Sequence, residues 1–191
     1  MKKIYKTFTV IITAVAMSVG IVNSASAANA ITNSNGKLYI GGSLGFNKLK
    51  PRVLTPGGRV TDDTSTGGKI YVGYDVGIKE FWNIEGFYAD LGSAGIDTGT
   101  VQGDIDYQIL GVNILYKKPF TNRFKGIAKL GYADVSNDAN NNINYRQVEN
   151  GDIFFGLGAE VPLNNHLNVR GEYEYFDKDI KMLSLGLNYH F

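Results

Sequence analysis

The sequence predicts an all-β protein, folded as one eight-stranded antiparallel up-and-down β-barrel that crosses a membrane. Three observations indicate this fold. Apolar and polar residues alternate with a period of two in eight segments of about ten residues, the length at which a tilted strand spans a bilayer. The connections between these segments are alternately long and short. The chain has 24 Gly, 12 Tyr and 10 Phe but only 4 Pro, which favours a β-barrel over a helical or disordered chain.

The N-terminal segment has the parts of a secretory signal peptide. Lysines occur within the first six residues, an uncharged and largely apolar run follows from Phe8 to Val22, and Ala25 and Ala27 then form a small-residue cleavage site. The run is shorter than the roughly 20 residues that a spanning helix needs. We therefore expect a signal peptide at residues 1–27 and a barrel domain at residues 28–191. A second cleavage site at 28–30 is an open alternative.

Charge and cysteine content exclude several classes of function. The formal net charge is only +1, so the composition gives no support for nucleic-acid binding. The chain has no Cys, which excludes disulfides, thiolate metal sites and a lipid-modified cysteine. After the leader no segment carries 18 consecutive apolar residues, so no transmembrane helix is expected.

Four strands are expected in the first half of the barrel domain. Apolar side chains occupy every second position, as Ile70, Val72 and Tyr74 do in the second of them. Gly, Pro, Ser and Asp mark the long connections at 47–67 and 92–103, and residues 79–81 form a tight turn. The expected strands are Lys37–Phe46, Gly68–Ile78, Trp82–Leu91 and Asp104–Tyr116.

Four more strands are expected in the second half. Short connections at 117–122 and 162–166 alternate with a long, Asn-rich one at 135–150 and a modest one at 177–180. Bacterial membrane barrels have an even number of strands, short turns on one side and longer loops on the other. The expected strands are Arg123–Asp134, Gly151–Val161, Leu167–Phe176 and Lys181–Phe191.

The last strand has the clearest alternation. Leu183, Leu185, Leu187, Tyr189 and Phe191 share one face, and small or polar residues occupy most of the other. A strand of this form that closes on Phe resembles the terminal strand by which bacterial outer-membrane β-barrels are recognised by their assembly machinery. The resemblance implies that Leu187, Tyr189 and Phe191 act as an assembly signal and that the barrel assembly machinery is a partner.

Aromatic residues cluster near the ends of the predicted outward faces. Amphipathic rings are stable at the headgroup level, and such girdles mark both rims of a membrane barrel. The aromatic residues are Phe46, Trp82, Tyr88, Tyr116, Phe124, Tyr173, Tyr175, Tyr189 and Phe191.

The chain after its leader resembles the small eight-stranded OmpA-like/OmpX-like outer-membrane barrels. The resemblance rests on residues 83–92, on 155–160 and on the terminal strand. It implies a transmembrane barrel in the bacterial outer membrane, in contact with outer-membrane lipid and lipopolysaccharide. The chain ends at Phe191, so the peptidoglycan-binding domain of full-length OmpA proteins is not expected.

The predicted inner face carries charges that must pair, because an unpaired charge in a narrow barrel is costly. We expect a network of Glu85, Lys129, Arg170 and Glu172, with Lys125, Glu160 and Glu174 on the same inner face. The family resemblance implies that such a cluster can gate a narrow passage. The last strand, however, offers no cation to it, and side chains about fill an eight-stranded interior. A structural core is therefore favoured over a gated pore.

An enzyme, a metal site and a cofactor site are not expected. Eight-stranded barrels that modify lipid A need a His base with Ser and a carboxylate near the outer leaflet. His166 lies in a predicted short turn and His190 lies beside the last residue, so both belong at the opposite end. The Asp-containing loops lack EF-hand spacing.

Two loops are candidates for surface contacts. The first contains Lys48, Lys50, Arg52 and Arg59, which could meet lipopolysaccharide phosphates or an acidic host polymer. A solvated loop is the favoured interpretation, because acidic residues offset the cluster. The Asn-rich segment at 137–142 is too polar to pack a core and is the best candidate for contact with a host or surface ligand.

These observations predict a non-enzymatic outer-membrane surface protein that contributes to envelope structure and presents loops for adhesion or host contact. Two alternatives stay open: a narrow gated channel, and a soluble lipocalin-like barrel whose apolar face surrounds a ligand.

Overall fold

The computed structural model describes residues 38–51, 54, 58–76, 81–99, 102–121, 123–139 and 151–191. The predicted leader, with its cleavage site at Ala25 and Ala27, lies outside these residues, as do Arg52 and residues 140–150 of the predicted Asn-rich loop. No helix among the described residues is long and apolar enough to span a membrane.

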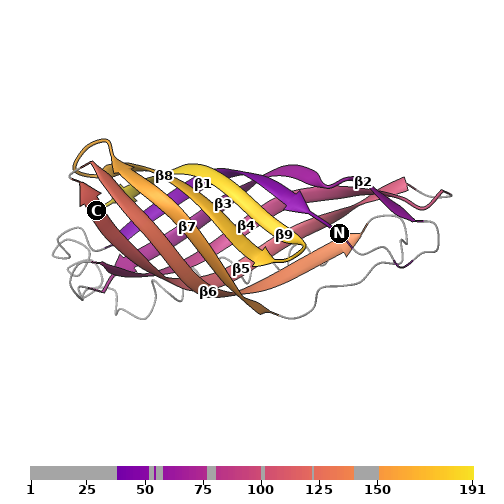
Figure 1. The fold of residues 1–191 in the computed structure, drawn as a ribbon, viewed down its shortest axis with the longest axis horizontal. Coiled ribbons are helices and arrows are strands. Elements are labelled where there is room, and N and C mark those ends of the chain that lie inside the picture. The colour runs from indigo at the N-terminus through magenta and orange to yellow at the C-terminus, as the bar shows by residue number, and fades with distance from the viewer. Residues whose placement is uncertain are drawn as a thin grey trace, which may run out of the picture.

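The described residues form nine strands, all paired antiparallel. Eight of them close a barrel in the order β1-β3-β4-β5-β6-β7-β8-β9, and β9 bonds back to β1 (Figure 1). The short β2 pairs only with the far end of β4. The strands are β1 Leu38–Leu49, β2 Arg59–Asp62, β3 Thr64–Asp75, β4 Trp82–Asp97, β5 Gln102–Thr121, β6 Phe124–Ala139, β7 Asp152–Pro162, β8 Leu167–Asp177 and β9 Ile180–His190.

Closure joins the first and last strands of the barrel. β1 and β9 pair continuously from Tyr39 opposite His190 to Leu49 opposite Ile180. Because hydrocarbon offers no hydrogen-bond partners, an open edge would leave backbone groups unsatisfied, and closure removes that edge. The predicted eight-stranded up-and-down barrel is therefore confirmed.

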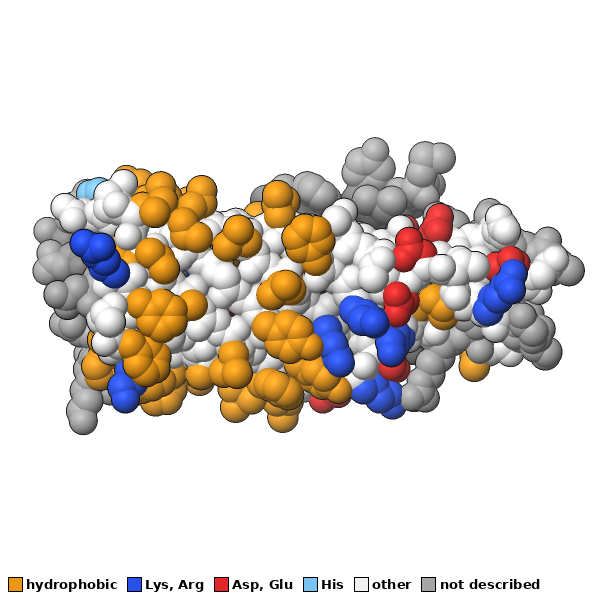
Figure 2. Space-filling model, turned by 45° about the horizontal axis from the view of Figure 1, so that its top comes forward, with side chains coloured by type: hydrophobic (Ala, Val, Ile, Leu, Met, Phe, Trp, Pro, Cys, Tyr) orange, Lys and Arg blue, Asp and Glu red, His pale blue; other side chains and the backbone are white. Residues whose placement is uncertain are grey.

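The outward face of the barrel is apolar over most of its length. Leu44 is 76% exposed and Leu185 is 64% exposed, values that are unfavourable in water but suit contact with lipid. Hydrophobic side chains cover one part of the surface, and charged side chains gather beyond it toward the end that carries β2 (Figure 2). We call the hydrophobic part of this surface, which includes Leu44 and Leu185, the apolar belt. The lipocalin-like alternative requires the reverse arrangement, with the apolar side chains pointing inward.

Strands β4, β5 and β6 exceed their predicted lengths the most. β5 has 20 residues, and β4 and β6 have 16 each, whereas β7, β8 and β9 have 11 each. Residues assigned to loops continue the ladder beyond the apolar belt, with Asp106 opposite both Ser93 and Asp138. The extensions face water on their outer side, so they lack the apolar alternation from which strands were predicted.

The two ends of the barrel differ. The C-terminal end of β9 lies beside the short connection from β7 to β8, where the backbone N–H of His190 donates to His166 at 2.7 Å. We call this the turn end. The opposite end carries β2, the extensions of β4 and β6 and the first residues of β5, and we call it the loop end (Figure 1). The predicted turn at 117–122 was partly wrong, because β5 continues to Thr121.

Glycines on the inner face make room for aromatic rings. The ring of Tyr39 lies over Gly73, and the ring of Tyr71 lies over Gly41 on the neighbouring strand. A Cβ atom at either glycine would overlap the ring. The lumen of a small barrel is packed like a protein core, so these positions have no spare volume.

We predict that Gly73→Ala lowers the free energy of unfolding by about 1–3 kcal/mol, the usual cost of overpacking a core. The new methyl group would displace Tyr39, whose hydroxyl donates to Glu85 at 2.8 Å. The measurement is urea unfolding of the detergent-folded barrel.

Gly86→Ala is the matched control, because a Cβ atom there would meet nothing within 4 Å. We expect it to leave stability unchanged or to raise it slightly, since Ala loses less backbone freedom on folding than Gly. Equal destabilisation by both substitutions would contradict the packing explanation.

Candidate functional site: the filled lumen

The lumen has two layers. Toward the turn end and the middle of the barrel it holds buried charged side chains, and toward the loop end most of its buried side chains are apolar. Among the described residues the buried charged side chains are Lys69, Lys117, Lys129, Arg170, Glu85, Glu160, Glu172 and Glu174. Four cations therefore face four carboxylates.

Arg170 on β8 crosses the lumen to Glu85 on β4. Both terminal nitrogens of its guanidinium bond to that carboxylate, with Nη2 at 3.1 Å from Oε2, and Nη2 also lies 2.5 Å from Oε1 of Glu172. All three side chains are almost fully buried. Bidentate pairing of this kind fixes geometry as well as charge.

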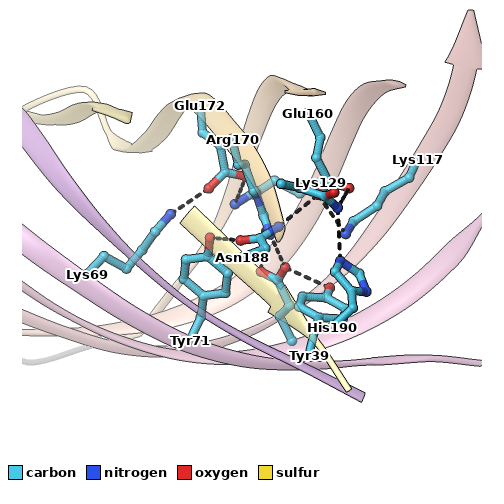
Figure 3. Close-up of polar contacts among 12 residues, drawn as sticks. Tyr39, Lys69, Tyr71, Lys117, Lys129, Glu160, Arg170, Glu172, Asn188 and His190 are labelled. Atoms are coloured by element: carbon cyan, nitrogen blue, oxygen red, sulfur yellow. Dashed lines mark hydrogen bonds and ion pairs between the residues drawn. The ribbon is translucent and has the colours of Figure 1, made fainter. Parts of the chain in front are cut away.

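Two lysines reach the same strand from other walls. Lys69 on β3 lies 2.8 Å from Glu172 and 2.5 Å from Glu174, and Lys129 on β6 lies 2.5 Å from Glu172 and 3.0 Å from Glu174. Glu172 is thus shared by two lysines and Arg170 (Figure 3). The inner face of β8 therefore forms ion pairs with residues of β3, β4 and β6.

A second cluster surrounds Glu160 near the turn end. Its carboxylate accepts from Lys117 at 3.1 Å and from the amides of Asn168 and Asn188 at 2.8 Å each. Lys117 also lies over the ring of Tyr39, 4.2 Å from its centroid. His190 contacts Asn168 through Nε2 at 3.1 Å (Figure 3). The hydroxyl of Tyr71 bonds to Asn188 and links this cluster to the first one.

The structure brings the four residues of the predicted charge network into one cluster, and it adds members that the sequence did not identify. These members are Lys69 and Lys117, and Lys117 belongs to the segment 117–122 that was predicted as a turn. Counting by twos from Asn113 and Leu115 would have placed Lys117 inward. Lys125 is half-buried beside Glu160 on the neighbouring strand.

The apolar layer closes the lumen at the loop end. The rings of Phe87 on β4, Phe154 on β7 and Phe176 on β8 meet there, with centroids 4.8 to 6.0 Å apart. Because β4 and β8 lie on opposite sides of the barrel, this contact spans the lumen.

The two histidines lie at the turn end, where the sequence placed them. His166 Nδ1 lies 3.0 Å from the carbonyl oxygen of His190. Neither residue lies near the loop end, where a lipid-modifying enzyme would need its base. Within the described residues, His, Asp and Glu side chains form no group of three or more that could hold a metal ion.

The predicted assembly residues lie on the lipid-facing surface of the turn end. Leu187, Tyr189 and Phe191 are all exposed. The ring of Tyr189 stacks on His166 at 5.8 Å and meets Phe191 edge-on at 5.3 Å. Their role as an assembly signal stays a prediction.

Beyond the apolar belt, the outer surface of β4, β5 and β6 is acidic. Asp106 lies near Asp90, Asp104 and Asp138, and partial burial raises the pKa of Asp106, with the charges of these three neighbours adding to the effect.

The basic residues predicted for the first loop are only partly neutralised. Lys48 lies 3.6 Å from Asp63, and Arg59 lies 3.4 Å from Asp97. Lys50 is exposed, and Lys181 on β9 lies directly opposite Lys48. The surface formed by β1 and β9 is therefore basic beyond the belt.

Comparison with known proteins gives the same fold. A family model described as outer membrane protein beta-barrel domain matches residues 12–191. No curated protein matches the chain by sequence.

The chain is also similar to three solved structures. Ail, the attachment invasion locus protein of Yersinia pestis, has 15% identity and a TM-score of 0.55 over 82% of this chain and 99% of Ail. Neisserial surface protein A has 12% identity and a TM-score of 0.55 over 81% of this chain and 97% of its own. OprG of Pseudomonas aeruginosa has 16% identity and a TM-score of 0.52 over 82% of this chain and 96% of its own. At such identities the likeness shows the fold.

We predict that Glu172→Gln lowers the free energy of unfolding by about 3–5 kcal/mol, because breaking a buried ion pair leaves charge uncompensated. Lys69, Lys129 and Arg170 would then share one carboxylate fewer. The measurement is urea unfolding, with Asp97→Asn as control, since its partner Arg59 is 76% exposed. A Glu172→Gln barrel as stable as the control would contradict the network's structural role.

Proposed function

Because the chain belongs to the outer membrane protein beta-barrel domain family, we propose that it is a non-enzymatic and non-conducting protein of the bacterial outer membrane. It contributes to envelope structure, contacts lipopolysaccharide in the outer leaflet, and presents its loop end for contact with a surface or host ligand. The outer-membrane location follows from the family and from the barrel itself.

One observation carries the proposal: the lumen is filled in both layers. Ion pairs join opposite walls in the polar layer, as Arg170 and Glu85 do, and the Phe87, Phe154 and Phe176 rings meet in the apolar layer. An ion would have to separate the first and displace the second. A filled interior is the usual condition of an eight-stranded barrel.

A narrow gated pore is the competing function. It needs the interior ion pairs to exchange partners and open a path. Lys69, Lys129 and Arg170 each already bond two carboxylates, and the three phenylalanine rings of the apolar layer carry no charge to exchange. Opening the polar layer alone would leave the aromatic rings in place.

Surface contact is supported by the shape of the loop end. β4, β5 and β6 continue beyond the apolar belt as a paired sheet, which holds the connections away from the lipid. Similar structures include an attachment invasion locus protein and a surface protein, and the former was also solved in complex with the heparin analogue sucrose octasulfate. We propose that this chain, too, makes its contacts at the loop end.

We predict that the purified barrel gives no ion current in a planar lipid bilayer, and that Glu85→Ala also gives none. The apolar layer does not depend on Glu85, so it keeps the lumen closed when the Arg170 pair is broken. An open porin in the same bilayer is the positive control. Step currents in the wild type, changed in size by Glu85→Ala or Lys129→Ala, would favour the gated pore.

We further propose that the lipid-facing side of β9, with Leu187, Tyr189 and Phe191, is recognised by the barrel assembly machinery. Phe191→Ala should lower the amount of heat-shifting barrel in the outer membrane of expressing cells several-fold. The purified variant should still refold in detergent, because Phe191 is 43% exposed and lies outside the lumen. Trp82→Ala is the control, because it removes an exposed aromatic side chain of β4 that also lies at the turn end of the barrel. Equal losses from both would argue against a signal in β9.

A further inference from the structure

A groove runs along the outside of the barrel where the apolar belt ends toward the loops. It is lined by residues of β8, β9, β1, β2, β3 and β4 and has a volume of about 790 Å³. Its lining changes along its length, from Phe46, Tyr173 and Leu183 to Lys48, Lys181 and Thr64. Neither the lumen network nor the proposed loop contacts use this groove.

The inner part of the groove is suited to hydrocarbon. Phe46 on β1 lies directly opposite Leu183 on β9, and Leu183 lies directly opposite Tyr173 on β8. The three side chains are 71%, 54% and 46% exposed. They form a continuous apolar surface across three strands at the edge of the belt.

Two lysines lie side by side at the outer part of the groove. Lys48 and Lys181 are directly opposite each other on β1 and β9 and point to the same outer face. Like charges in this position destabilise a sheet. Lys181 also lies over the ring of Tyr175, 5.3 Å from its centroid. Figure 2 shows Lys and Arg side chains gathered where the hydrophobic surface ends. An anion bound between the two lysines would remove their repulsion.

The acidic neighbours leave this pair available. Lys48 is 3.6 Å from Asp63, but the two side chains are 53% and 39% exposed, and exposed pairs of this kind contribute little. Asp62 also lines the groove, and its carboxylate accepts from the backbone N–H and the hydroxyl of Thr64. On another side of the barrel, the outer surface of β5 is acidic. An anion would therefore bind on the β1–β9 side rather than on the β5 side.

We propose that this groove binds a phosphorylated, acylated glycolipid of the outer leaflet, with a phosphate between Lys48 and Lys181 and an acyl chain along Phe46 and Leu183. The proposal rests on the outer-membrane orientation given above, because the loop end then faces the leaflet that holds lipopolysaccharide. Thr66 lines the groove directly opposite Phe46, and its hydroxyl can bond to a sugar. A soluble anion would not use the apolar surface, and an uncharged lipid would not use the lysines.

The test measures binding of bisphosphorylated, hexa-acylated lipid A to the detergent-folded full chain by native mass spectrometry. We expect the wild type to retain this lipid and the double variant Lys48→Ala/Lys181→Ala to bind it at least about tenfold more weakly, since two contacts to a charged group are lost. Removing both phosphates from the lipid should weaken binding to the wild type by a similar factor.

Lys118→Ala is the matched control. Lys118 is exposed on the outer face of β5 near the turn end, and it lies 6.0 Å from the ring of Phe120, as Lys181 lies near Tyr175. Its loss changes the net charge without touching the groove, so binding should be unchanged.

Three results would overturn the proposal that the groove binds this glycolipid. They are lipid A binding that survives the double substitution, binding of phosphatidylglycerol as tight as that of lipid A, or equally tight binding of a soluble sulfated saccharide without acyl chains. Each sample is also run unboiled and boiled on a gel, because a closed barrel shifts on heating. A wild type without that shift would overturn the barrel and the proposed function. A normal shift without lipid A binding would overturn the groove alone.

Discussion

Charge neutrality inside the lumen is the condition on which the rest of the structure depends. The outer wall faces hydrocarbon, so charged side chains within the belt can only point inward. The lumen is narrow enough for Arg170 and Lys69 to reach carboxylates on other walls. Four cations and four carboxylates therefore share one buried space, and Glu172, which contacts three of the cations, is the centre of it.

The two layers of the lumen have different consequences. The polar layer ties the walls together by ion pairs, and the aromatic layer joins opposite walls by ring contacts near the loop end. The groups that can contact other molecules lie outside, in the sheet that extends beyond the belt and in the lysines where the belt ends. Beyond the belt, the outer surface is therefore acidic on the β5 side of the barrel and basic on the β1–β9 side.

The fold could be predicted from the sequence because lipid leaves few alternatives. Strict alternation such as Leu183, Leu185 and Leu187 has one structural meaning in a bilayer. The extensions could not be predicted, since outward residues such as Ser136 and Asp138 are polar and exposed, so this part of β6 lacks that signal. The faces of Glu85 and Arg170 followed from a period of two, but their contact depends on how far the strands are staggered around the barrel. Lys117 was not predicted to face the lumen, because residues 117–122, which include Pro119, were predicted as a turn. Pro119 in fact lies near the end of the strand.

The spacing of Arg170, Glu172 and Glu174 along β8 also bears on how the barrel reaches one alignment. A slip of one residue would turn the apolar side chains inward, and burial rejects it. A slip of two keeps every side chain on its correct face and re-forms most of the backbone ladder. The order of charges distinguishes it: after a slip of two in one direction, Glu172 would stand where Arg170 meets Glu85, and two carboxylates would face each other. The lumen charges thus act as a check on strand alignment during closure, which backbone hydrogen bonding alone cannot supply.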